Sequence, residues 1–64
     1  MKLYSCIAVS NTIKSIEVQG YLVYAESEDK ARQYALRTYN TIMGQYPQQV
    51  KVVLVNLDTV NYAL

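Results

Sequence analysis

The strands expected of this sequence are apolar on both faces, and a chain of only 64 residues has little else with which to cover them. Successive side chains of a β-strand point to opposite faces of the sheet. Residues 21–25 (YLVYA) and 50–57 (VKVVLVNL) place large apolar side chains on both faces. A domain of this size buries only about 60% of the surface that its unfolded chain exposes. We therefore expect the chain to cover one sheet face and a second protein surface to cover the other.

Two strands are expected before the first helix signal. Residues 2–9 alternate apolar side chains and are rich in β-branched and aromatic types, which favours a strand. Residues 10–12 (SNT) have turn chemistry, and residues 13–25 predict a long second strand that pairs antiparallel with the first.

The second strand changes its apolar parity near Gly20. Ile16 and Val18 share one parity before this glycine, whereas Tyr21 and Val23 have the other parity after it. One extra residue in a β-bulge at positions 19–20 would put both sets on the inward face. The alternative is an ordinary glycine in an edge strand.

Residues 28–43 predict one helix. Ser27 is a good N-cap, Glu28 and Asp29 place negative charge in the first turn, and Gly44 and Pro47 follow the end. Helical spacing puts one stripe toward the sheet: Ala31, Tyr34, Ala35, Thr38 and Ile42. A shoulder beside this stripe comprises Leu36, Tyr39 and Met43. The combined apolar arc is wider than one sheet face requires.

These elements predict a single α+β domain over residues 1–64. Its expected form is a small antiparallel sheet of three strands with one helix packed on one face, in the order β-β-α-β. Residues 50–57 supply the third strand, and residues 58–64 (DTVNYAL) could add a short fourth strand or a tail that docks on a neighbouring protein.

Composition argues against several classes of function. The net charge of +1 comes from basic residues spread without a run, so the clustered basic face of a nucleic-acid binder is missing. With no histidine and one cysteine, neither a zinc site nor the usual catalytic base is expected, and Cys6 is interpreted as a small buried hydrophobe. We expect no enzyme activity, no cofactor and no metal.

The expected location is the cytoplasm. No apolar run approaches the roughly 18 residues of a membrane span, no signal-peptide core follows the first residues, and a single free cysteine agrees with a reducing compartment.

Seven tyrosines, with no phenylalanine or tryptophan, are the most unusual feature of the composition. Tyrosine gives a large amphipathic contact area and is enriched in protein interfaces. The alternative is that most of these rings line the core or its rim. Stacking on nucleic-acid bases is disfavoured, because it normally accompanies a basic groove.

The junction of the second strand and the helix has a recognisable pattern. Residues 20–36 (GYLVYAESEDKARQYAL) contain a strand with alternate apolar positions that ends in Ala-Glu-Ser and runs into a helix with an acidic start. This stretch resembles that of small phage and mobile-element proteins of the DpnD/PcfM-like type, although Leu22 and Tyr24 stand where charged residues are often found there. The resemblance implies a small accessory protein, with a host defence or regulatory factor as the natural class of target and the host cytoplasm as its place.

The function expected from these observations is a non-enzymatic interaction protein that binds and inhibits a protein target as a homodimer. The interaction surface is predicted from the outward strand parity and the helix shoulder: Leu22, Tyr24, Leu36, Tyr39 and Met43. The alternative is a nucleic-acid or nucleotide-ligand binding protein that uses Tyr, Lys and Arg side chains from both copies of a dimer.

Overall fold

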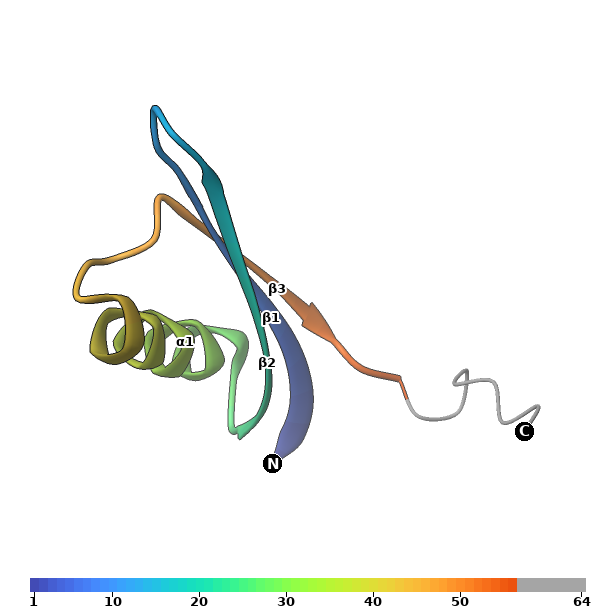
Figure 1. Cartoon of the computed structure of the whole chain (residues 1–64). Coiled ribbons are helices and arrows are strands. Elements are labelled where there is room, and N and C mark those ends of the chain that lie inside the picture. The colour runs from blue at the N-terminus through green and yellow to red at the C-terminus, as the bar shows by residue number, and fades with distance from the viewer. Residues whose placement is uncertain (57–64) are drawn as a thin grey trace, which may run out of the picture.

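A computed structural model describes residues 1–56 of the chain. The elements follow the order β1 (Lys2–Asn11), β2 (Ile16–Ala25), α1 (Glu28–Met43) and β3 (Gln49–Leu54). Within the described residues the three strands form one antiparallel sheet in the order β2-β1-β3, and α1 lies across one of its faces (Figure 1). The predicted α+β fold and its ββαβ order are therefore confirmed. The expected fourth strand or tail at 58–64 lies outside the described residues.

The turn between β1 and β2 occurs later in the chain than the sequence indicates. β1 continues to Asn11, and β2 begins at Ile16. The backbone N–H of Thr12 donates to the Ser15 carbonyl at 2.8 Å, and the Thr12 hydroxyl donates to the same carbonyl at 2.9 Å. This threonine closes the turn at residues 12–15, because its side chain doubles the backbone bond across it.

The predicted β-bulge at Gln19–Gly20 is wrong. The β1–β2 ladder is continuous from the pair Lys2 and Ala25 to the pair Asn11 and Ile16, with Gly20 opposite Ile7. Gly20 is therefore an ordinary glycine in an edge strand, which was the alternative.

Because the ladder is continuous, Gln19 faces α1 together with Tyr21, whereas Ile16 and Val18 point to the opposite side of the sheet. The polar Gln19 is tolerated on the inward side because its amide has partners. The Tyr21 hydroxyl donates to Gln19 Oε1 at 2.7 Å, and Gln19 Nε2 donates to the Met43 sulfur at 3.4 Å.

The limits of α1 are those that the sequence predicts. The Ser27 hydroxyl accepts a hydrogen bond from the Lys30 N–H at 3.2 Å, which caps the first turn. At the other end, Gly44 has φ of 75°, and its N–H donates to the Asn40 carbonyl at 2.8 Å. Glycine adopts this left-handed conformation without steric cost, so the chain can leave the helix here.

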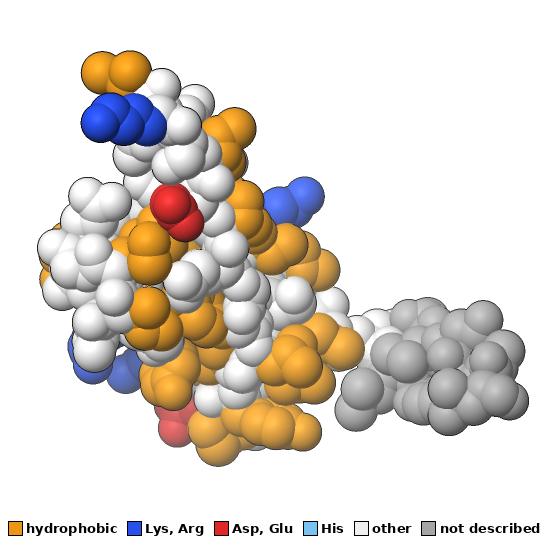
Figure 2. Space-filling model, viewed as in Figure 1, with side chains coloured by type: hydrophobic (Ala, Val, Ile, Leu, Met, Phe, Trp, Pro, Cys, Tyr) orange, Lys and Arg blue, Asp and Glu red, His pale blue; other side chains and the backbone are white. Residues whose placement is uncertain are grey.

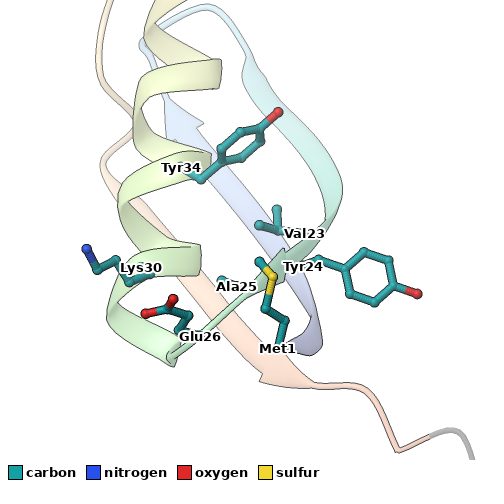
Figure 3. A pocket seen from close by; sticks show the side chains of 7 residues that line it. All are labelled: Met1, Val23, Tyr24, Ala25, Glu26, Lys30 and Tyr34. Atoms are coloured by element: carbon teal, nitrogen blue, oxygen red, sulfur yellow. The ribbon is translucent and has the colours of Figure 1, made fainter.

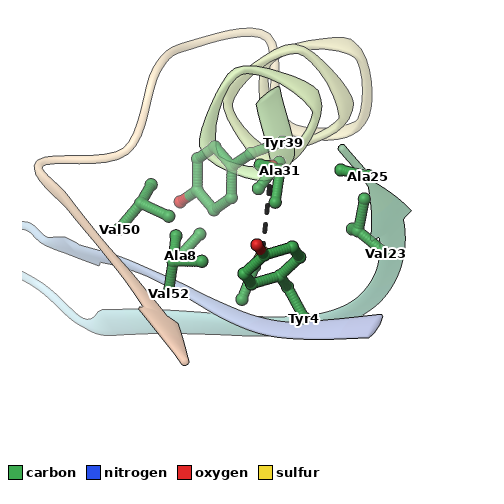
Figure 4. Close-up of a cluster of buried hydrophobic side chains, with 10 residues drawn as sticks. Tyr4, Ala8, Val23, Ala25, Ala31, Tyr39, Val50 and Val52 are labelled. Atoms are coloured by element: carbon green, nitrogen blue, oxygen red, sulfur yellow. Dashed lines mark hydrogen bonds between the residues drawn. The ribbon is translucent and has the colours of Figure 1, made fainter. Parts of the chain in front are cut away.

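The core lies between α1 and the inward face of the sheet (Figure 4). Its fully buried members are mostly small: Cys6, Ala8, Ala31, Ala35 and Tyr39. The helix is turned toward Leu36 and Met43 relative to the prediction, so that Tyr34 and Ile42 are 57% and 58% exposed and the expected core position of both is wrong. The wide apolar arc did not determine which side of the helix faces the sheet, because Ala31 and Ala35 belong to more than one possible apolar stripe.

Tyr39 gives the first prediction. Its ring fills the core, but within the described part of the chain its buried hydroxyl has no hydrogen-bond partner. An unsatisfied buried polar group costs about 1–3 kcal/mol, so we expect Tyr39→Phe to leave the free energy of unfolding unchanged or to raise it by about 1 kcal/mol. Tyr39→Ala should lower it by about 3–5 kcal/mol, as removal of a buried aromatic ring does. Urea unfolding of both variants measures the contrast, and a marked loss of stability in Tyr39→Phe would contradict it.

Candidate functional site

The candidate functional site is the sheet face that α1 does not cover, here called the bare face. Its apolar residues occupy odd positions of β1, even positions of β2 and one odd position of β3. They are Leu3, Ile7, Val9, Ile16, Val18, Leu22, Tyr24 and Val53. Figure 2 shows hydrophobic side chains along the side of the molecule turned away from α1. No described element covers this face.

Side chains of the bare face are highly exposed on the edge strand β2 and remain exposed on the central strand β1. Leu22 is 72% exposed, Tyr24 is 67% exposed, and Ile7 of β1 is 41% exposed although strands flank it on both sides. The six most exposed side chains are Ile7, Ile16, Val18, Leu22, Tyr24 and Val53. Together they leave on the order of 700 Å² of surface in contact with water, whereas the largest apolar patch on a typical monomer covers ~300–600 Å². Patches of this kind mark binding surfaces.

A hollow of about 360 Å³ lies where β1 begins, β2 ends and the described chain leaves β3. Leu3 and Tyr24 of the bare face line this hollow, and Met1, Leu54 and Val55 complete the apolar lining of the hollow. The hollow extends the bare face and could take a protruding apolar side chain of a partner.

A second hollow, of about 270 Å³, lies between the end of β2 and the start of α1 (Figure 3). Val23 and Ala25 lie at its base, and Tyr34 projects from the helix beside them. Glu26 and Lys30 also line this hollow, but in Figure 3 their charged ends are turned away from Val23 and Tyr34. A small-molecule site normally has polar groups that converge on the ligand. This hollow has no such arrangement among the described residues, so it offers a weaker candidate than the bare face.

The five residues predicted for the interaction surface do not form one surface. Leu22 and Tyr24 lie exposed on the bare face, as expected of their parity. Leu36 and Met43 are half-buried against the core on the other side of the sheet. Tyr39 is fully buried, so its expected place at the surface is corrected: its ring belongs to the core. The role of the four accessible residues in binding remains a prediction.

The interaction surface predicted from the sequence left out four exposed members of the bare face: Ile7, Ile16, Val18 and Val53. The signal was present in the even positions of residues 16–24, which are apolar except for glycine at position 20. The assumed bulge assigned Ile16 and Val18 to the inward set and so removed them from the outward one. Without a bulge, simple alternation finds this stripe.

Few polar groups are placed for chemistry. Burial raises the pKa of the Cys6 thiol, and the nearby Arg32 guanidinium opposes this only in part. The thiol lies 3.8 Å from the Ala31 carbonyl, to which it donates a weak hydrogen bond. Residues 1–56 contain no group of three His, Cys, Asp or Glu side chains that could hold a metal ion. No helix in this part of the chain is long and apolar enough to cross a membrane.

No protein-family model, curated protein or solved structure matches the chain. The bare face therefore has to be interpreted from its own geometry.

The raised pKa of Cys6 gives a second prediction. The buried thiol stabilises the fold in its neutral form, because its folded pKa lies above its unfolded pKa. This contribution to the free energy of unfolding is complete below the unfolded pKa and is lost as the pH rises through the folded pKa. We expect the free energy of unfolding to fall above pH 9.0, the ordinary value for the thiol, and to fall less steeply in Cys6→Ala. Burial also raises the pKa of Tyr21, which acts in the same direction in both proteins.

Urea unfolding across this pH range measures both slopes. Equal slopes in the two proteins would contradict the assignment to Cys6. The variant should keep the association state of the parent, because the thiol is buried on the α1 side of the sheet.

Proposed function

We propose that this protein is a small non-enzymatic interaction module that works as a homodimer, with the bare faces of two copies packed against each other. The observation that supports this is the apolar bare face, which no described part of the chain covers. Packing two such faces gives a β-sandwich, in which the sheets lie about 10 Å apart with their inner side chains interdigitated.

The size of the bare face suits a second copy. Its exposed side chains offer on the order of 700 Å² per chain, close to the ~800 Å² per partner of a standard protein interface. Lys51 is the one charged residue of β3, and its position in the strand directs it to this face. A long lysine side chain can lay its methylene groups along an apolar surface and keep its ammonium group at the rim, so this charge is compatible with the contact.

The dimer acts, in this proposal, by binding and inhibiting a protein target. The class of target, a host defence or regulatory factor, rests on the resemblance of residues 20–36 to small phage accessory proteins. The surface left to such a target is the exposed side of α1.

Replacement of Val53 by Asp tests the bare-face contact. Val53 is 47% exposed on β3, at the opposite edge of the sheet from β2. We expect Val53→Asp to weaken association by roughly 30-fold or more, the effect of losing an interface contact worth about 2 kcal/mol. The folded chain should survive, because the carboxylate is hydrated when the copies separate.

Ile42→Asp is the matched control, since Ile42 is similarly exposed but lies on α1. Analytical ultracentrifugation at micromolar concentration gives the masses, and circular dichroism reports the fold. A parent mass equal to the 7.3 kDa of one chain would refute the homodimer. Equal masses for parent and Val53→Asp would refute the bare face as its interface.

A further inference from the structure

The two edges of the sheet differ in how they are protected. β2 forms one edge over ten residues, without proline or bulge and with Glu17 as its one charged residue. Natural proteins usually protect an exposed edge strand with charges, prolines or bulges, because its free N–H and C=O groups can pair with another strand. β2 has little such protection.

The backbone groups that β2 presents outward can be identified. Residues of an antiparallel ladder turn their N–H and C=O groups alternately toward one neighbouring strand and away from it. The bond from Val55 N–H to the Leu3 carbonyl shows that odd positions of β1 turn toward β3, and the bond from Thr12 N–H to the Ser15 carbonyl shows that even positions turn toward the β2 side. In the β1–β2 register even positions of β1 face odd positions of β2. The outward groups of β2 therefore belong to Ile16, Val18, Gly20, Leu22 and Tyr24.

Part of the opposite edge, which β3 forms, is covered by a side chain of the helix. By the same alternation the even positions of β3 turn outward, and the carbonyl of one of them, Val50, accepts a hydrogen bond from Arg32 Nη1 at 2.6 Å. The half-buried arginine side chain therefore occupies part of the β3 edge. On the β2 edge no described side chain does the same.

We propose that β2 pairs with β2 of a second copy, antiparallel and centred on Gly20. This register is self-complementary: Gly20 faces its own equivalent, Val18 faces Leu22 of the second copy, and Ile16 faces Tyr24. All five outward residues then exchange their N–H and C=O groups across the edge, which gives about ten new hydrogen bonds. A register shifted by one residue, in which Gly20 faces Tyr21 of the second copy, would set outward groups against inward ones and lose this match.

The side chains agree with the register. On the bare face each apolar residue meets another apolar residue, which stabilises cross-strand pairs. On the α1 side Glu17 faces Val23 of the second copy, so no like charges are opposed. At the centre Gly20 has no side chain, and an added Cβ, which would point to the bare face, would have no atom within 4 Å.

This edge contact is distinct from the bare-face contact, and the two are compatible. The two-fold axis of the edge pair is perpendicular to the sheet, whereas the axis that relates two packed sheets runs parallel to them. Perpendicular two-fold axes that intersect generate a closed tetramer, a common form of homo-oligomer. If the proposed bare-face dimer forms, on which this part of the inference rests, edge pairing joins two such dimers into a tetramer of four 7.3 kDa chains.

Gly20→Pro tests the edge contact. Proline removes the outward N–H of Gly20 and places its ring at the centre of the proposed pair, but it leaves the hydrogen bonds to β1 intact, since edge strands tolerate proline where the N–H faces solvent. We expect Gly20→Pro to halve the mass of the assembly, from four chains to two. Gly20→Ala is the matched control, because it keeps the N–H and should keep the mass of the parent.

Amide hydrogen exchange of the unmodified protein provides a test that needs no variant. The amides of Gln19 and Tyr21 face β1 and should exchange slowly in any folded state. The amides of Val18, Gly20 and Leu22 should be equally slow only if the edge is paired, and we then expect their exchange to be slowed by roughly 100-fold or more relative to an unstructured chain. Exchange of these three amides at nearly the rate of an unstructured chain, beside slow Gln19 and Tyr21, would overturn the edge pair.

The masses separate this inference from the proposed function. If Gly20→Pro leaves the mass unchanged while Val53→Asp lowers it, the bare-face dimer stands and the edge pair is refuted. If Gly20→Pro gives single chains and Val53→Asp changes nothing, the edge pair stands and the bare-face dimer is refuted. Halving of the mass by each variant supports both. A parent mass of one chain refutes both.

Discussion

The close approach of α1 to the central strand is the contact on which the rest of this structure depends. Ala31 and Ala35 on the helix face Cys6 and Ala8 on β1 within a core where all four are fully buried. Small side chains on both sides let the helix lie near the sheet, and the ring of Tyr39 occupies the remaining space. One helix can close only one face of a sheet in this way. The apolar side chains of the other face are therefore left uncovered by the described chain.

The element order and the limits of the helix could be predicted because their causes are local. Ser27 and Gly44 act through hydrogen bonds to residues three or four positions away, and such signals are present in the sequence itself. The parity of β2 was less accessible. The sequence alone gave no reason to expect a glutamine on the inward face, because the partners of Gln19 include Met43, 24 residues away.

The candidate site could be predicted only where its residues follow from local alternation along a strand. Leu22 and Tyr24 follow from simple alternation, and they lie where alternation puts them. The helix residues failed because a wide apolar arc permits several phases, and only packing against the sheet selects the one that buries Tyr39. The free edge of β2 depends on the strand order, which places β1 in the centre. That order is set by pairing between distant segments, and the sequence pattern did not specify it.

The hydrogen bond from Arg32 to the Val50 carbonyl has a consequence for the growth of any assembly. A sheet with two open edges can add strands without limit, and the product is a fibre. Here the pairing of β2 with its own equivalent would consume one edge of each copy, and the edge that remains is the one that the guanidinium occupies. In the proposed assembly this arginine would obstruct part of the remaining edge, where a further strand would have to add, and would so oppose growth into a fibre.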